Sequence, residues 1–188
     1  VGFPTVRYDE QSSHAEEVLN DSTATLTRFD YRQSLQTSGV GINAKLGVIF
    51  IPVEWMRIGV AAHSPSRISL SDQWSSSMDT KFKNGNAYSV QSPFGQYDYN
   101  LTTPARVIGS IAFIIAKSGL VSADYEVVDY SQAKLRSSAY AGEAANSFTN
   151  ENIAIKENYA ATCNLRLGME WRFAPFTVRA GYAHYGSP

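Results

Sequence analysis

Charged side chains alternate with apolar ones in the segment Asn158–Phe173, and more follow just after it. The guanidinium of Arg166 or Arg179 can bind a carboxylate through two parallel hydrogen bonds, so these two residues are candidates to bind the headgroup of a carboxylate solute. The alternative is a structural network, in which the charges pair with one another and are hydrated. The charged residues that we expect together, on the face opposite the apolar residues, are Lys45, Arg57, Asp124, Glu126, Arg166, Glu170, Arg172 and Arg179.

A second group of candidates is aromatic. Trp74, Phe82, Tyr88 and Phe94 lie in or beside a polar stretch, Ser71–Pro93, that we interpret as a long connection. Rings exposed on such a connection would form a first binding site for a hydrophobic solute. They could equally pack the connecting segments against one another. Both roles remain open at this point.

Signals for other chemistry are weak, and we predict neither a catalytic residue nor a cofactor. The histidines at positions 14, 63 and 184 are scattered, without the spacing of metal ligands, so no metal site is expected. Gly39, Gly41 and Ala44 match a dinucleotide-binding spacing, but a strand follows them instead of a helix. A hydrolase that uses a serine with His63 is conceivable, although His63 beside Ser64 is more simply an interface residue. The single Cys163 falls on an apolar face and excludes an intrachain disulfide.

The element that must position the charges is an unusually long strand. In Asn158–Phe173, odd positions are apolar and even positions are mostly polar, which is a β period. Sixteen residues would span roughly 53 Å, and with a tilt of about 45° they would still climb roughly 37 Å. A strand that long can cross a bilayer, so we interpret it as one strand of a transmembrane β-barrel.

The same alternation recurs along the chain and gives about seven strands. We expect them over residues 1–17, 26–51 with a bend at 38–41, 56–70, 94–116, 120–134, 158–173 and 176–185. Short turns near 53, 118 and 174 alternate with long loops near 22, 82 and 145, as in bacterial outer-membrane barrels. Pro104 should lie at an unpaired position, and Leu135–Ile155 should be a polar connection. Aromatic residues gather beside the short turns, as in an interfacial girdle: Trp55, Trp171, Phe173 and Phe176.

Two hairpin registers follow from the turns. A loop at residues 174–175 pairs Phe173 with Phe176, Trp171 with Val178, Met169 with Ala180 and Leu167 with Tyr182 on the apolar face. It also sets Glu170 opposite Arg179 on the other face. A three-residue loop around Ser118 would pair Phe113 with Ala123 and Ile111 with Tyr125.

Composition fits this fold class, which is all-β: an antiparallel transmembrane β-barrel of outer-membrane type. The 188 residues are 44% hydrophobic and 12% aromatic, with a net charge of −1, so no nucleic-acid partner is expected. No run approaches the ~18 apolar residues of a transmembrane helix. The ends lack a signal segment, and a new strand begins just before Pro188. We therefore expect residues 1–188 to be one partial barrel domain cut from a longer chain.

Several motifs carry a resemblance. KLGVIFIPVEWMRIGVAAHSP (residues 45–65), YDYNLTTPARVIGSIAF (97–113), GLVSADYEVVDYS (119–131), and the phrases GFPTVRY and TSGVGINAKLG resemble outer-membrane transport proteins of the FadL/TodX family. The resemblance implies a fourteen-stranded barrel with an N-terminal plug that moves long-chain fatty acids or aromatic hydrocarbons across the outer membrane. About half of such a barrel fits in this chain. The implied partners are outer-membrane lipid, lipopolysaccharide and a hydrophobic solute.

Three function classes remain open. Passive transport of hydrophobic small molecules is the leading one. A barrel that acts as a scaffold or receptor for other envelope proteins, and a barrel-embedded lipid hydrolase, are the alternatives. The sequence predicts neither the solute nor the gate.

Overall fold

The computed structural model describes residues 1–19, 25–138 and 148–188. Every strand pair in these residues is antiparallel, so the predicted all-β class is confirmed. The strands are β1 (Thr5–Glu17), β2 (Leu26–Ile42), β3 (Lys45–Val53), β4 (Met56–His63), β5 (Arg67–Phe82), β6 (Ala87–Gln91), β7 (Gly95–Thr102), β8 (Arg106–Ile115), β9 (Gly119–Asp129), β10 (Lys134–Ser137), β11 (Ala161–Phe173) and β12 (Phe176–Tyr185). The helices are η1 (Tyr130–Gln132) and α1 (Thr149–Asn158). No helix in this described part of the chain is long and apolar enough to cross a membrane.

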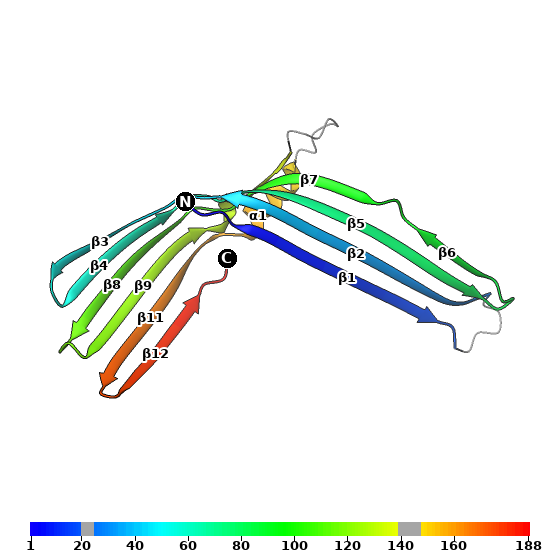
Figure 1. The fold of residues 1–188 in the computed structure, drawn as a ribbon. Helices are drawn as coiled ribbons and strands as arrows, with labels where there is room; N and C mark the ends of the chain where they lie inside the picture. Colours follow the sequence, from blue (N-terminus) through cyan, green and yellow to red (C-terminus); the bar gives the residue numbers. More distant parts are fainter. Residues whose placement is uncertain (20–24, 139–147) are drawn as a thin grey trace.

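The strands form two sheets that meet at an angle (Figure 1). The first sheet has the order β1-β2-β5-β7-β10, with β6 paired to β5, and the second has the order β3-β4-β8-β9-β11-β12. Because β2 continues into β3, β4 into β5, β7 into β8 and β9 into β10, the sheets are two halves of one wall. We call the interruptions at residues 43–44, 64–66, 103–105 and 130–133 the seam. With each continued pair counted once, and the short strand β6 left aside, the described residues form seven long strands, the number expected.

Short turns lie together at one end of the wall. They fall at residues 54–55, 116–118 and 174–175, at the end of the second sheet that is farthest from the seam (Figure 1). The long connection expected near residue 82 is a hairpin that leads into β6. The loops expected near residues 22 and 145 lie outside the described residues.

Four segment predictions were wrong in detail. Residues 71–82 belong to β5 and not to a polar connection, and residues 135–155 contain most of β10 and part of α1. The bend expected at 38–41 falls at 43–44. The long strand starts at Ala161, because residues up to Asn158 form α1. Its 13 residues span roughly 43 Å.

One predicted register is confirmed and the other is wrong by two residues. Strands β11 and β12 pair Leu167 with Tyr182 and Glu170 with Arg179, together with the other three predicted pairs. In the β8–β9 hairpin, Phe113 pairs with Val121 and Ile111 with Ala123. The faces are unchanged by a shift of two. Asp124 lies opposite Ser110, so its carboxylate is on the polar face.

The second sheet carries a continuous apolar surface, which we call the belt. Its side chains are exposed instead of being buried between layers, since Val60, Leu167 and Met169 are 58%, 43% and 45% exposed. Cross-strand pairing joins them in unbroken rows. The belt consists of Leu46, Val48, Phe50, Met56, Ile58, Val60, Ala62, Val107, Gly109, Ile111, Phe113, Val121, Ala123, Tyr125, Val127, Cys163, Leu165, Leu167, Met169, Trp171, Phe173, Phe176, Val178, Ala180 and Tyr182.

Gly39 allows close packing in the first sheet. A Cβ at position 39 would lie 2.5 Å from the carbonyl oxygen of Ser69 and 2.6 Å from Cδ2 of Leu70. We expect Gly39→Ala to destabilise the protein by about 1–3 kcal/mol, because backbone atoms must move to make room. Gly109→Ala is the matched control, since nothing lies within 4 Å of its Cβ position; there alanine should stabilise by about 0.5–1 kcal/mol. Urea unfolding in lipid vesicles measures both, and equal effects would contradict the packing role.

Candidate functional site

The two sides of the wall can be followed across the seam through β2 and β3. Asn43 extends the β1–β2 register, because it exchanges backbone hydrogen bonds of 2.9 and 3.0 Å with Gly2. Ala44 extends the β3–β4 register, because its carbonyl accepts a 2.9 Å hydrogen bond from the Ser64 amide. The backbone therefore stays extended, and even-numbered residues stay on one side from β2 into β3. The belt side thus continues into the first sheet.

The neighbouring long strand adds one residue at the seam. Ile42 pairs with Arg67, and Lys45 pairs with His63, so residues 43–44 face residues 64–66. Two residues opposed by three is the arrangement of a β-bulge. Because paired residues share a side, the pairing carries the belt side from β2 onto β5, β7 and β10.

Polarity reverses across the seam. In the first sheet the belt side is polar, with Ser, Gln, Asn, Thr, Arg and Asp residues along β5 and β7, whereas the inner side, opposite the belt, holds most of the large apolar and aromatic residues. Ile68 and Leu70 on that inner side are buried. The set, which we call the inner apolar face, is Phe29, Tyr31, Leu35, Ile68, Leu70, Trp74, Met78, Phe82, Tyr88, Val90, Tyr97, Tyr99, Leu101 and Leu135.

Three of the four predicted aromatic residues belong to the inner apolar face. Trp74 is 44% exposed, and its ring lies over Gly95 on β7, where any side chain would collide with it. Phe82 and Tyr88 contact each other edge to face at the tip of the β5–β6 hairpin, with ring centroids 5.7 Å apart. Phe94 precedes β7 and is not part of that face, but it lines a groove of about 180 Å³ together with Trp74 and Gln73.

A further aromatic cluster lies on the same face near the seam. Tyr97 and Tyr99 stack with centroids 6.1 Å apart, and Phe148, just before α1, contacts both rings. The hydroxyl of Tyr99 donates a 3.5 Å hydrogen bond to Asp72, which also accepts a 2.7 Å bond from Thr37. Burial and the Asp72 carboxylate raise the pKa of Tyr99, so the phenol stays neutral at physiological pH. Sequence reasoning missed this cluster, because Phe148 is distant in the chain.

The inner side of the second sheet holds a network of ion pairs around Glu126. This carboxylate is only 3% exposed. It accepts hydrogen bonds of 2.9 Å from the Asn164 amide and 3.0 Å from Arg166, and Arg106 lies 3.8 Å away. The guanidinium of Arg166 also lies 5.8 Å from the ring centroid of Tyr185. Four neighbouring strands are thereby linked by side chains.

Arg179 belongs to a separate pair of contacts. Glu170 accepts hydrogen bonds of 2.8 Å from Arg179 and 3.0 Å from Arg172. The two arginine side chains are about three-quarters exposed, so solvent screens both pairs and their contribution to stability is small. The structure therefore places Arg166 and Arg179 in different clusters, each already paired with a carboxylate. The structural network is the role that this geometry favours.

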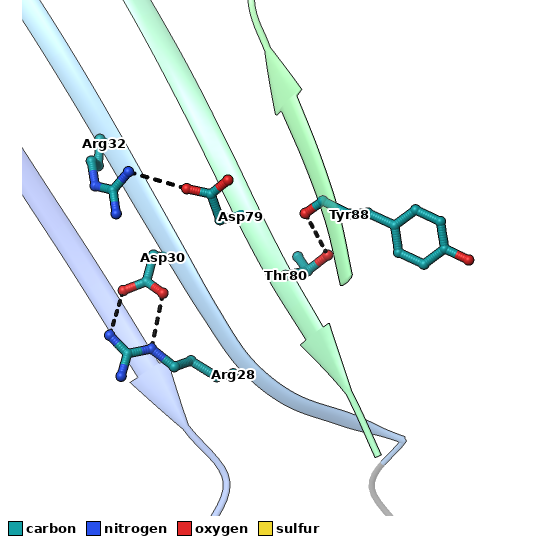
Figure 2. Close-up of polar contacts among 6 residues, drawn as sticks. All are labelled: Arg28, Asp30, Arg32, Asp79, Thr80 and Tyr88. Atoms are coloured by element: carbon teal, nitrogen blue, oxygen red, sulfur yellow. Dashed lines mark hydrogen bonds and ion pairs between the residues drawn. The ribbon is translucent and has the colours of Figure 1, made fainter. Parts of the chain in front are cut away.

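Ion pairs also stabilise the belt side of the first sheet. Figure 2 shows Arg32 on β2 reaching Asp79 on β5, at 3.1 Å, and Arg28 beside Asp30. The guanidinium of Arg28 donates bonds of 2.7 and 2.9 Å to Asp30 and holds the pKa of that carboxyl below its usual value. Arg7 is paired with Asp9 at 3.1 Å in the same way.

The hydrolase hypothesis finds no support at Ser64. Its hydroxyl accepts a 2.8 Å hydrogen bond from the Ala44 amide and donates to the Pro65 carbonyl at 3.1 Å. The side chain is thus used to bridge the seam instead of being presented to His63. Within residues 1–19, 25–138 and 148–188, no group of three His, Cys, Asp or Glu side chains could hold a metal ion.

No family model and no curated protein sequence matches this chain. Among solved structures, the chain is similar to the crystal structure of the Ralstonia pickettii toluene transporter TbuX, with 15% sequence identity and a TM-score of 0.36. The similarity covers 98% of this chain and 56% of TbuX, so the chain spans about half the length of that protein. At this identity and TM-score, the strand pairing of the chain itself remains the basis for its fold.

Proposed function

We propose that this chain forms part of an outer-membrane β-barrel of the FadL/TodX type, through which hydrophobic small molecules cross passively. Long-chain fatty acids and aromatic hydrocarbons are the solute classes that this function implies. The observation that carries the proposal is the reversal of polarity at the seam. An apolar outer surface suits the hydrocarbon layer, and a polar outer surface above it suits the hydrated sugars of the outer leaflet.

The inner apolar face supports the choice of solute. A hydrophobic molecule that enters above the membrane finds partly exposed rings there, at Trp74 and Tyr88, instead of water. Aromatic and aliphatic side chains bind such solutes mainly by removing apolar surface from water. Below the seam, Glu126 and Glu170 pair with four arginines of the inner side, Arg106, Arg166, Arg172 and Arg179. The solute path then runs along the inner side of both sheets.

A scaffold or receptor barrel is the second candidate. The polar belt side of the first sheet is an extended surface that another envelope protein could contact. Such a protein would need the belt for insertion, but it would not need the inner apolar face. Solute entry therefore separates the two functions.

The test is solute entry into vesicles whose outer leaflet contains lipopolysaccharide. The protein should accelerate entry of a labelled long-chain fatty acid relative to protein-free vesicles. Replacing two exposed rings, by Trp74→Gln with Tyr88→Gln, should lower the rate at low solute concentration by roughly threefold to tenfold, because apolar binding surface is lost.

The matched control is Gln73→Ser with Ser89→Ala, whose side chains lie beside the two rings but on the belt side. This variant should transport at the rate of the unmodified protein. Equal rates with and without protein would refute transport and leave the scaffold function. Equal rates for the two double variants would mean that the inner apolar face is not part of the solute path.

A further inference from the structure

Three cations gather on the belt side just above the seam. Arg67 begins β5 and Lys134 begins β10, and both pair with Thr102 on the strand between them. Arg136 pairs with Asn100 in the next row. All three side chains are exposed. We call Arg67, Lys134 and Arg136 the basic patch.

The basic patch differs from the other arginines of this surface. Arg7, Arg28 and Arg32 lie on the same side of the first sheet, and each is ion-paired with an aspartate. None of the three patch residues has a carboxylate within 4 Å in the described residues. The described residues therefore place no counter-charge in contact with them.

Two carboxylates, Asp98 and Asp129, lie on this side of the strands that adjoin the patch. Asp98 lies two residues before Asn100 on β7 and accepts a 3.5 Å bond from Gln96. Asp129 ends β9 and accepts three hydrogen bonds, two from Ser131 and one from Gln132. Asp129 thus caps the N-terminus of η1. The three cations outnumber the two carboxylates, so the patch has a net positive charge.

The patch lies directly above the edge of the belt. The last belt row before the seam is Leu46, Ala62, Val107 and Val127. Only residues 103–105 separate β8 from β7, so Thr102 is within roughly 16 Å of chain from Val107. Lipid headgroups lie at this height when the belt is in hydrocarbon.

The spacing of the patch suits a phosphate. Adjacent strands are about 4.8 Å apart, so the backbones of Arg67 and Lys134 are separated by roughly 10 Å. Their long side chains can converge on one anion between them, over Thr102. Ser69 donates a 2.9 Å hydrogen bond to Oδ1 of Asn100, and the Asn100 amide group then points its donors elsewhere, toward a ligand oxygen or water.

We propose that Arg67, Lys134 and Arg136 bind the phosphate groups of an anionic glycolipid headgroup in the outer leaflet. This inference rests on the outer-membrane location in the proposed function, but not on solute transport. Charge-assisted hydrogen bonds from guanidinium and ammonium groups hold the phosphate. The serine, asparagine and threonine side chains between them are suited to sugar hydroxyls. The patch would fix both the depth of the protein and the lipid beside it.

The test compares purified protein in detergent with two probes, lipopolysaccharide and lipopolysaccharide from which phosphate has been removed enzymatically. The unmodified protein should bind the phosphorylated form more tightly, with an affinity that falls as salt is raised. The variant with Arg67→Gln, Lys134→Gln and Arg136→Gln should lose at least tenfold in affinity for that form. Its affinity for the dephosphorylated form should not change.

The control variant carries Arg7→Gln, Arg28→Gln and Arg32→Gln, which remove the same charge from the same side. It should lose less than threefold. Equal losses in the two triple variants, or equal binding of the two probes, would overturn the inference. So would inorganic phosphate binding as tightly as lipopolysaccharide, because the site would then be one for a soluble anion.

A charge-preserving variant guards against misfolding. Arg67→Lys with Lys134→Arg should retain most of the affinity if charge at these positions is what binds. If this variant folds and binds no better than the triple glutamine variant, the inference fails. Loss of solute entry with intact lipid binding would instead refute only the transport function.

Discussion

Arginine at position 123 should destabilise the protein in a bilayer by roughly 2–4 kcal/mol, the cost of a cation at the centre of a lipid-facing surface. Ala123 lies in the middle of the belt, where it pairs with Ile111 on one side and Leu167 on the other. A guanidinium there has no carboxylate within its row, and it must reach toward a headgroup to remain hydrated. Reversible urea unfolding in lipid vesicles measures the loss.

Arginine at position 122 is the matched control. Ser122 is the adjacent residue on β9, but its side chain lies on the inner side, opposite Ala112 and Gly168. The new cation would then be near Asp124 and Glu170 instead of lipid. We expect a loss of about 1 kcal/mol or less. Similar losses at positions 122 and 123 would mean that the belt does not contact hydrocarbon.

The second large effect is expected at Glu126. Glu126→Leu should destabilise the protein by roughly 2–4 kcal/mol, because the buried Asn164 amide loses its acceptor and Arg166 and Arg106 lose their counter-charge. The loss is smaller than for a fully buried ion pair, because both arginine side chains are more than one-third exposed and solvent screens their charge. The measurement is the same unfolding experiment.

Two variants separate charge from packing at this site. Glu126→Gln keeps an acceptor for Asn164 and should cost about half as much as Glu126→Leu. Glu170→Leu removes an inner-side carboxylate whose arginine partners are exposed, and it should lower the urea midpoint much less than Glu126→Leu does. If Glu126→Leu unfolds at the same urea concentration as the unmodified protein, the network has no structural role and Arg166 is free to bind a solute.

Local patterns were enough to predict the β11–β12 hairpin. Its two-residue turn leaves one register that keeps Leu167 and Met169 on one face and Glu170 on the other, and the structure has that register. The register of the β8–β9 hairpin could not be predicted from its turn in the same way. Ala116 and Lys117 both adopt positive φ, 48° and 58°, which neither residue type favours. The loop therefore closes between Ile115 and Gly119, two residues from the predicted register.

Strand β5 was missed although its signal was present. Ile68, Leu70, Trp74, Met78 and Phe82 occupy even positions, but the serines between them suggested a connection. If β5 lies outside the hydrocarbon layer, as the proposed function requires, its outer side faces a polar medium and does not show the apolar alternation of a membrane-spanning strand. The reversal of polarity at the seam was missed for the same reason, because it follows from cross-strand pairing of residues far apart in the chain. The inner apolar face and the basic patch depend on that pairing.

The reversal of polarity at the seam would also fix the depth of the protein in the bilayer. The belt runs along β11 from Cys163 to Phe173, and with a tilt of about 45° its eleven residues rise roughly 25 Å, the height of the apolar band in outer-membrane barrels. In the proposed location, moving the protein outward would place the apolar belt among sugars, and moving it inward would place the serine-rich surface among acyl chains. The outer side of four neighbouring long strands changes from apolar to polar at the seam. Movement of the protein along the membrane normal is therefore opposed in both directions at each of these strands.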